Sequence, residues 1–311
     1  MTAAAPSLEQ SSRETIQKGS KSFASAAALF DAQTRADAEM LYAWCRHCDD
    51  VIDGQELGHG MAALDAATAH DRLTALYAKT RAALAGEPTD DADFGAFQRV
   101  ALRRHIPERY AIELLDGFAM DVMARRYETL EDTLEYCWHV AGVVGVMMAL
   151  VMGVAPDDLP TLRRAQDLGL AFQLTNISRD VIEDAANDRI YLPSAWLAEA
   201  GVPEGEIRLK KRRAAVFGVT KRLLAAAEPY YASALAGLPA LSFRSAWAIA
   251  AARGVYRQIG VIVEARGAKA WDVRASASTP MKAWLALQGG FVALGSRGKT
   301  APERPALWSK I

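Results

Sequence analysis

The stretch QLTNISRDVIEDAANDRIYLP, residues 173–193, places polar side chains on one face of an otherwise apolar helix. With Gln173 at 0°, a helix of 3.6 residues per turn places Asn176 at about 300°. Asp180 then falls at about 340° and Asp184 at about 20°. Apolar residues surround this stripe, which indicates that it faces the interior of the protein. A buried polar stripe is costly unless a ligand, a metal ion or a partner side chain satisfies it.

A second acidic stripe lies upstream, in LYAWCRHCDDVID at residues 41–53. Asp49 and Asp53 are one helical turn apart on the same face, whereas Asp50 points further round the helix. Two carboxylates at this spacing repel each other on an isolated helix. A divalent cation removes that repulsion, and Mg²⁺ commonly binds one or two carboxylates together with waters and substrate phosphate oxygens.

One D-x-x-x-D pair alone is common on a solvated helix face and does not indicate a binding site. Two such pairs in one chain indicate that their carboxylates act together. If the two helices face each other, four carboxylates line one cavity, where several Mg²⁺ ions can bridge to a diphosphate. Arg179 and Arg189 flank the second stripe and would bind the same phosphates by charge-assisted hydrogen bonds. The sequence therefore predicts a site for metal ions and a diphosphate.

Helical periodicity runs through the chain, and the alternation typical of strands is nearly absent. The helices expected from this pattern are Ala36–Ile52, Ala66–Leu84, Glu108–Tyr127, Leu134–Met152, Leu159–Ala186, Lys210–Leu235 and Ala246–Ala265. No linker rich in Pro, Gly or Ser divides the chain. We therefore predict one all-α domain over residues 1–311, with residues of about 1–12 and 296–311 loosely ordered.

Charge and cysteine content narrow the class of protein. Lys and Arg number 36 against 37 Asp and Glu, so no global field attracts nucleic acid, and no nucleic-acid partner is expected. Three cysteines do not form a disulfide framework, which favours an intracellular, cytoplasmic protein. The absence of a G-x-G-x-x-G motif argues against a nicotinamide or flavin cofactor of Rossmann type.

Two stretches bear on membranes. Residues 136–156 lack Asp, Glu, Lys and Arg and could nominally span a bilayer. Acidic residues flank the stretch and no second span exists, so a buried core helix is favoured over a transmembrane helix. The basic run RLKKRRAAVFGVTKR, residues 208–222, fits a solvated helix face; the alternative is a contact with anionic lipid head groups.

Four segments in order resemble the squalene/phytoene synthase family, and together they cover most of the chain. They are GSKSF at residues 19–23, YAWCRHCDDVID at 42–53, YCWHVAGVVGVMMALV at 136–151 and LGLAFQLTNISRDVIEDAANDRIYLP at 168–193. The resemblance implies an isoprenoid-synthase helical bundle around a large central cavity. It also implies head-to-head condensation of two allylic prenyl diphosphates.

The same resemblance implies roles for particular residues. The residues expected to bind Mg²⁺, with Mn²⁺ as an alternative, are Asp49, Asp53, Asn176, Asp180 and Asp184. The residues expected to hold diphosphate are Ser20, Lys21, Ser22, Arg46, Arg179 and Arg189. The residues expected at the reacting end of the cavity are Tyr42, Gln173 and Tyr256, with Tyr136 near the carbocation. Catalytic roles are expected for Tyr42, Arg46, Tyr136 and Arg179. Some members of the family have Arg at the position of Lys21. The compact ammonium group of lysine replaces the planar guanidinium group of arginine there.

The overall likeness is strongest to bacterial phytoene synthases. It implies that two geranylgeranyl diphosphates condense through a cyclopropylcarbinyl diphosphate, prephytoene diphosphate, to phytoene in carotenoid biosynthesis. No NADPH is expected, because loss of a proton, rather than hydride addition, ends this reaction. One alternative is a C15-using relative that makes dehydrosqualene or squalene; another is a non-catalytic helical scaffold of the same family. Because the hydrocarbon product is hydrophobic, we expect the protein to contact the membrane peripherally. We expect it in a bacterial cytoplasm, with other carotenoid-pathway enzymes as possible partners.

Overall fold

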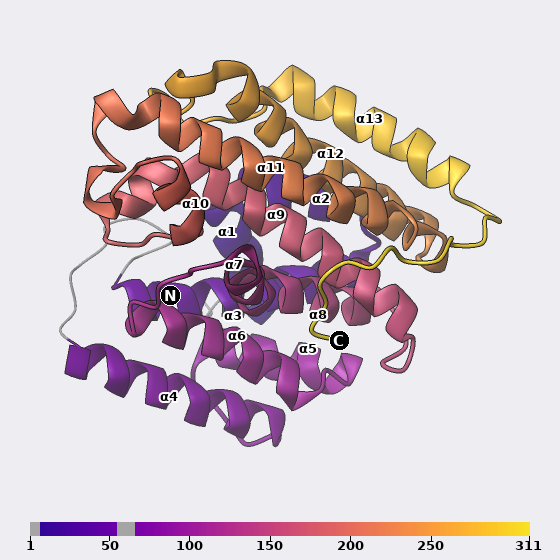
Figure 1. Ribbon diagram of the computed structural model, residues 1–311. Helices are drawn as coiled ribbons and strands as arrows, with labels where there is room; N and C mark the ends of the chain where they lie inside the picture. Colours follow the sequence, from indigo (N-terminus) through magenta and orange to yellow (C-terminus); the bar gives the residue numbers. More distant parts are fainter. Residues whose placement is uncertain (1–6, 55–65) are drawn as a thin grey trace.

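The computed structural model describes residues 7–54 and 66–311, apart from the side chains of residues 21, 22 and 66. The described residues contain helices and no strand, which confirms the all-α prediction (Figure 1). The α-helices are α1 (Leu8–Gly19), α2 (Lys21–Ala27), α3 (Ala32–Asp53), α4 (Ala66–Leu84), α5 (Ala92–Arg104), α6 (Glu108–Val122), α7 (Leu130–Cys137), α8 (Val143–Val151), α9 (Leu159–Ala186), α10 (Ser194–Glu199), α11 (Arg213–Leu235), α12 (Phe243–Arg266) and α13 (Thr279–Gly295).

Helix α9 is the central element of the bundle and packs against α8, α11 and α12. Its start follows from local sequence signals. The Asp158 side chain accepts a hydrogen bond from the Thr161 amide at 3.1 Å, and Pro160 lies in the first turn, where its missing N–H is harmless. The predicted bounds of this helix are confirmed. The second acidic stripe therefore sits on the longest helix of the described chain.

The apolar stretch around residues 136–151 is a core element, although its form differs from the single helix expected over Leu134–Met152. Helix α7 passes into a π-helix at Trp138–Gly142 and then into α8. Leu130–Val151 is apolar and long enough to cross a bilayer, but 67% of its most apolar window is buried inside the protein. A buried core helix of a globular protein gives the same composition.

Close backbone contact joins this segment to α9. A Cβ on Gly145 would collide with the Ala165 carbonyl, and a Cβ on Gly169 would collide with the Ala141 carbonyl. Glycine is required at both positions because any side chain would force the two segments apart. These two glycines thus set the distance between α9 and the helix that carries Tyr136.

Other boundaries differ from the expectations. Helix α6 ends at Val122 rather than Tyr127, because Met123 leaves the helical conformation and Ala124 adopts a positive φ. The periodicity did not indicate α1, α2, α5, α10 or α13. Helices α2 and α10 are short, with 7 and 6 residues. Helix α13 is apolar on nearly every side, so its sequence lacks the separate apolar and polar faces that indicate a helix.

The two ends of the chain are more ordered than expected within the described residues. Residues 8–12 belong to α1, where Ser12 is buried. The tail after α13 has no regular structure, but Arg304 holds the buried carboxylate of Asp167 through contacts of 2.9 and 2.7 Å. Leu307 and Trp308 pack on the core. The expectation of a loosely ordered tail therefore does not hold for residues 304–308, because a long-range buried ion pair fixes them.

Candidate active site

A cavity of about 690 Å³ lies between α2, α3, α6, α8, α9 and α12. One end is lined by charged and amide groups from α3 and α9, and the remainder is lined mostly by Ala, Leu, Val, Met and Phe. Arg164 and Arg179 both line it, and the helical rise places these two residues of α9 roughly 23 Å apart. The cavity is thus long and apolar, with a polar mouth.

Helix α3 presents the first acidic stripe at this mouth. The helix begins where the Asp31 side chain accepts from the Thr34 amide, and it ends directly after Asp53, at Gly54 with φ of 60°. Arg46 pairs with Asp49 and also with Asp50, at 2.7 Å. Asp53 is buried and pairs with an arginine that follows α9, described next.

Arg189 joins the two acidic helices. Its guanidinium lies in the segment after α9 and binds both carboxylate oxygens of Asp53 on α3. The neighbouring carboxylates of Asp53 and Asp121 raise its pKa against the opposing effect of burial. The pair brings the ends of α3 and α9 together, as the facing-helices prediction requires.

On α9, Asp180 accepts hydrogen bonds from Arg179 at 2.5 Å and from Arg274 at 2.9 Å. Asn176 donates to the Gln173 side-chain oxygen at 3.2 Å. The Asn176 side-chain oxygen is buried and accepts no hydrogen bond from the described residues. An orphaned buried amide oxygen is unusual in a native structure and points to a missing partner such as a cation.

Burial makes several carboxyls of this mouth hard to ionise. Desolvation, with the nearby Asp53 and Asp50 charges, raises the pKa of Asp49 to about 7 despite the opposing Arg46 charge. Desolvation, with the Asp180 charge next in importance, holds the pKa of Asp184 well above its usual range. Such crowding of like charges is relieved by a divalent cation. Carboxylate and amide oxygens are also the donor types that Mg²⁺ prefers, so these residues fit the expected metal.

Asp121 is a half-buried carboxylate that the acidic-stripe analysis missed. It lies on α6, lines the cavity, and accepts hydrogen bonds from the Tyr136 hydroxyl at 3.0 Å and the Tyr191 hydroxyl at 2.9 Å. The two phenol rings are stacked, with centroids 4.5 Å apart. Desolvation raises the pKa of Asp121 to about 6, against the attraction of Arg189. Asp121 thus fixes the orientation of Tyr136 beside the mouth.

Aromatic rings form the wall next to the polar mouth. Tyr256 is stacked on Phe172 with centroids 4.1 Å apart, and Phe23 lies 5.5 Å from Tyr256 and 6.0 Å from Tyr42. A Cβ on Gly19 would lie 2.7 Å from the Tyr42 hydroxyl, so glycine at that position makes room for the tyrosine. Aromatic faces carry partial negative charge and can attract a cation.

The structure places most of the residues expected at the site around this one cavity. Those that line it are Ser20, Tyr42, Arg46, Asp49, Tyr136, Gln173, Asn176, Arg179, Arg189 and Tyr256. Asp53, Asp180 and Asp184 do not line it directly, although the first two pair with arginines that do. The side chains of Lys21 and Ser22 lie outside the described residues. Sequence reasoning missed Asp121, Phe172 and Arg274, which also line the cavity.

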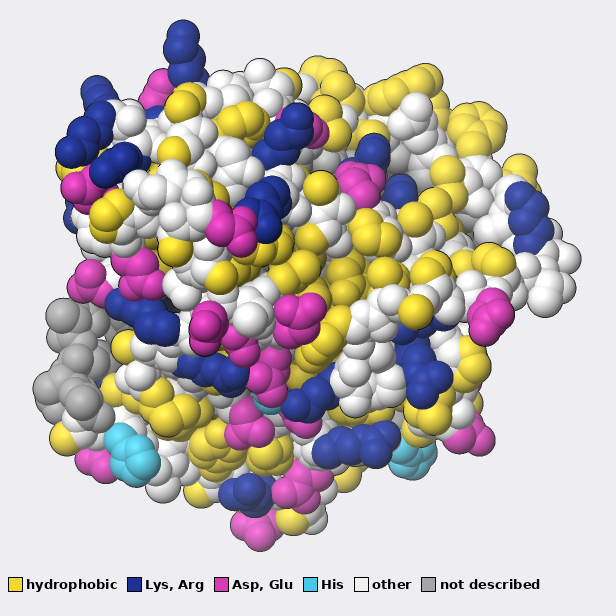
Figure 2. Space-filling view, viewed as in Figure 1, with side chains coloured by type: hydrophobic (Ala, Val, Ile, Leu, Met, Phe, Trp, Pro, Cys, Tyr) yellow, Lys and Arg dark blue, Asp and Glu magenta, His cyan; other side chains and the backbone are white. Residues whose placement is uncertain are grey.

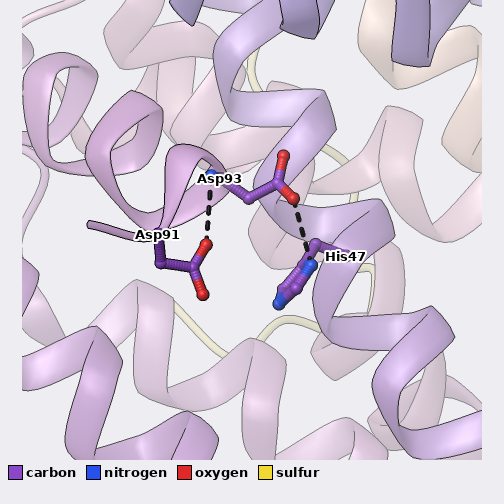
Figure 3. Close-up of side chains that lie close together, drawn as sticks. All are labelled: His47, Asp91 and Asp93. Atoms are coloured by element: carbon purple, nitrogen blue, oxygen red, sulfur yellow. Dashed lines mark hydrogen bonds and ion pairs between the residues drawn. The ribbon is translucent and has the colours of Figure 1, made fainter. Parts of the chain in front are cut away.

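Two other clusters in the described chain bring together groups that could share a metal ion, and neither contains a residue of the acidic stripes. In the first, His47 Nδ1 lies 3.1 Å from an Asp93 oxygen, and the Asp93 amide donates to Asp91 at 3.2 Å (Figure 3). Asp91 caps α5 and also pairs with Lys79 at 3.0 Å, so its oxygens already have partners.

The second cluster is formed by Glu113, Asp116 and His139. Glu113 accepts from the indole of Trp138 at 2.7 Å, and Asp116 accepts from the Tyr77 hydroxyl at 2.5 Å. Both clusters therefore have structural hydrogen-bond partners that explain them. The carboxylates at the cavity mouth are instead balanced by Arg46, Arg179, Arg189 and Arg274.

Comparison with known proteins agrees with this geometry. A family model for squalene/phytoene synthases matches residues 16–281. A 15-cis-phytoene synthase from Pantoea ananas is 52% identical over 98% of this chain and 98% of its own length. A 15-cis-phytoene synthase from a Paracoccus strain is 49% identical over 97% of this chain and 98% of its own. A dehydrosqualene synthase crystal structure has a TM-score of 0.80 at 24% identity, covering 93% of this chain and 97% of that one, and supports the fold.

Proposed function

The chain belongs to the squalene/phytoene synthase family, and from this premise we propose that it is a phytoene synthase that joins two geranylgeranyl diphosphates head to head. The observation that carries the proposal is identity of about half the residues with bacterial 15-cis-phytoene synthases over nearly the whole length of both chains. It is a prenyltransferase, and the expectation of an enzyme of carotenoid biosynthesis is confirmed.

The polar mouth suits the diphosphate ends of the substrates. Arg46, Arg179 and Arg189 line it, and their guanidinium groups can hold phosphate oxygens by bidentate, charge-assisted hydrogen bonds. The proposed Mg²⁺ ligands are Asp49, Asp53, Asn176, Asp180 and Asp184. Mg²⁺ bound there, or Mn²⁺ in its place, would neutralise charge that develops on the departing diphosphate.

The apolar part of the cavity suits the prenyl chains and the cation. Loss of the first diphosphate leaves an allylic cation, which the second chain's double bond attacks to form a cyclopropylcarbinyl diphosphate with loss of a proton. Phe172 and Tyr256 form a water-excluding wall with ring faces that attract positive charge. Tyr136, which donates a hydrogen bond to Asp121, also lines the cavity.

Departure of the second diphosphate permits rearrangement, and loss of another proton gives a conjugated triene. This ending needs no hydride, so the proposal includes no NADPH. The cavity extends along α9 for roughly 23 Å between Arg164 and Arg179, which is long enough for a C20 chain to lie extended within it.

The test is to incubate the purified protein with geranylgeranyl diphosphate and Mg²⁺ in detergent, without NADPH. The proposal expects a C40 triene, and chelation of the metal should stop its formation. Absence of any product from folded protein would instead favour the non-catalytic scaffold. Asp180→Ala serves as the matched control, because it removes a proposed ligand and should abolish turnover while leaving the fold intact.

A further inference from the structure

Helix α13 exposes an apolar face that the reaction does not use. Trp284, Leu287, Phe291 and Leu294 are 54%, 51%, 68% and 62% exposed. Their spacing places them on one side of the helix. Six of the thirteen exposed large hydrophobic side chains in the described residues belong to α13, which also contributes Met281 and Val292. Figure 2 shows hydrophobic side chains gathered along its upper right edge, where α13 runs in Figure 1.

The opposite side of α13 is fixed to α12. A Cβ on Gly289 would lie 2.7 Å from the Ala251 amide nitrogen, and the Trp247 indole donates to the Ala286 carbonyl at 2.7 Å. Ser278 caps the start of α13 by accepting from the Met281 amide at 3.4 Å. The apolar face is therefore held rigidly outward and is not a mobile segment waiting to fold onto the core.

The charge of this segment complements an anionic surface. Between Val273 and Pro302 the sequence contains no Asp or Glu. Of its four basic residues, Arg274 pairs with Asp180, and Arg297 donates to the Leu238 and Leu241 carbonyls. Lys282 and Lys299 are the two that remain to meet lipid head groups. A helix with exposed Trp, Phe and Leu and basic neighbours is typical of one that lies in the interface of a bilayer. Anionic lipid head groups attract such basic neighbours.

The position of the face relates it to the cavity. Helix α12 alone separates α13 from the cavity, since Ala248, Ala252 and Tyr256 of α12 line the inner side. A C40 hydrocarbon leaves water readily for lipid. When the exposed face of α13 rests on a bilayer, only α12 lies between the lipid and this side of the cavity. The hydrocarbon product is then formed close to the lipid in which it dissolves. This step rests on the proposed function, whereas the exposed face and its charge do not.

The basic run at residues 208–222, which the sequence offered as the alternative lipid contact, is less suited to that role. Lys211 and Arg212 pair with Glu206 at 3.8 and 2.5 Å, and Arg222 pairs with Glu199 at 2.6 Å. These carboxylates neutralise much of its charge. We propose that the exposed face of α13, formed by Trp284, Leu287, Phe291 and Leu294, is the surface by which the protein docks on anionic lipid membranes.

The test is flotation of the full-length protein with vesicles of phosphatidylcholine and phosphatidylglycerol, without substrate. Phe291→Glu should lower the vesicle partition coefficient at least tenfold, because it places a carboxylate where a phenyl ring would enter the lipid. Met123→Glu is the matched control, since Met123 is 70% exposed at the end of α6 and should bind as the wild type does. Vesicles of phosphatidylcholine alone should bind the wild type more weakly than the anionic vesicles.

Several results would overturn the proposal. Equal binding of the Phe291→Glu and wild-type proteins would remove α13 from the contact. Loss of binding in a Lys210→Glu/Lys211→Glu variant, with Phe291→Glu unaffected, would assign the contact to the basic run. A wild-type dimer in sedimentation velocity that Phe291→Glu converts to a monomer would show that a second copy covers this face.

Turnover measured in detergent micelles distinguishes a failure of the docking proposal from a failure of the proposed function. Phe291 lies outside the cavity, so Phe291→Glu should retain wild-type turnover of geranylgeranyl diphosphate in micelles while it loses vesicle binding. Phe291→Ser should show the same pattern with a smaller loss, because it removes the ring without adding charge. An inactive wild-type protein that still binds vesicles through α13 would refute the function and leave the docking surface standing.

Discussion

Replacing Arg304 with alanine should lower the free energy of unfolding, although Arg304 is far along the chain from both acidic stripes. The Asp167 carboxylate is fully buried, and Arg304 contacts its two oxygens at 2.7 and 2.9 Å. Ser233 donates a further hydrogen bond to it. Removing one partner of a buried pair leaves the other charge uncompensated and typically costs 3–5 kcal/mol, so we expect about 3 kcal/mol for this partly exposed arginine.

The assay is urea unfolding followed by circular dichroism. With a slope near 3 kcal/mol per molar for a chain of this size, the loss should lower the unfolding midpoint by about 1 M. Arg257→Ala is the matched control, because its pair with Glu228 is about half exposed on both sides and should contribute less than about 1 kcal/mol. A midpoint for Arg304→Ala no lower than that of Arg257→Ala would refute the claim that the pair fixes the tail.

A double variant tests the physical reason for the loss. Asp167→Leu combined with Arg304→Leu removes both charges, so it should recover much of the stability that Arg304→Ala loses. The same network holds Arg164, which lines the cavity and donates to the Ser233 hydroxyl at 2.8 Å and the Pro302 carbonyl at 2.5 Å. The tail therefore supports the end of the cavity farthest from the acidic stripes.

Four further outcomes follow from the site. Burial raises the pKa of Asp49 to about 7 and a ligand must be deprotonated, so Mg²⁺ should bind more tightly as pH rises through 7; calorimetry at pH 6 and 8 giving equal affinities would contradict this. Asp49→Ala should reduce turnover at least about 100-fold and Asp50→Ala less than about tenfold, since Asp50 points away from the helical face that Asp49 and Asp53 share; equal losses in steady-state assays would count against the assigned helical face. Arg189→Ala should raise the KM for geranylgeranyl diphosphate at least about tenfold by removing charge-assisted bonds to phosphate, and unchanged kinetics would place Arg189 outside the diphosphate site. Gly169→Ala should cost about 1–3 kcal/mol in urea unfolding because its methyl group meets a backbone carbonyl, and wild-type stability would show that α9 can shift freely.

Local patterns in the sequence were sufficient for the bounds of the central helix and for the shared face of each acidic pair, whereas most other site residues were expected only from the family resemblance. Helix α9 carries a capping Asp158, an early proline and a polar stripe, and each is a signal readable within one turn of the residue concerned. The spacing of Asp49 and Asp53 likewise predicted a shared face, and the structure brings both helix ends together through Arg189. The shared face of each acidic pair depends on the period of the helix alone, whereas the cap and the proline are signals of single residues.

The residues that sequence reasoning missed depend on contacts between distant parts of the chain. Asp121 shares α6 with three other acidic residues, and nothing nearby in the sequence indicates that Tyr136 and Tyr191 donate to it. The partnership of Arg304 with Asp167 is equally invisible before the helices are packed. The π-helix after α7 was not predicted either; its Ala141 carbonyl lies against Gly169 of α9.

The central claim is that this cavity joins two C20 substrates, and a competition experiment tests it most directly. The purified protein is given equal concentrations of geranylgeranyl and farnesyl diphosphates with Mg²⁺, with and without NADPH, and the hydrocarbons are identified by mass spectrometry. The account predicts a C40 triene as the main product, unaffected by NADPH. A predominant C30 product would contradict the substrate assignment, even though the fold and the acidic mouth would remain as described.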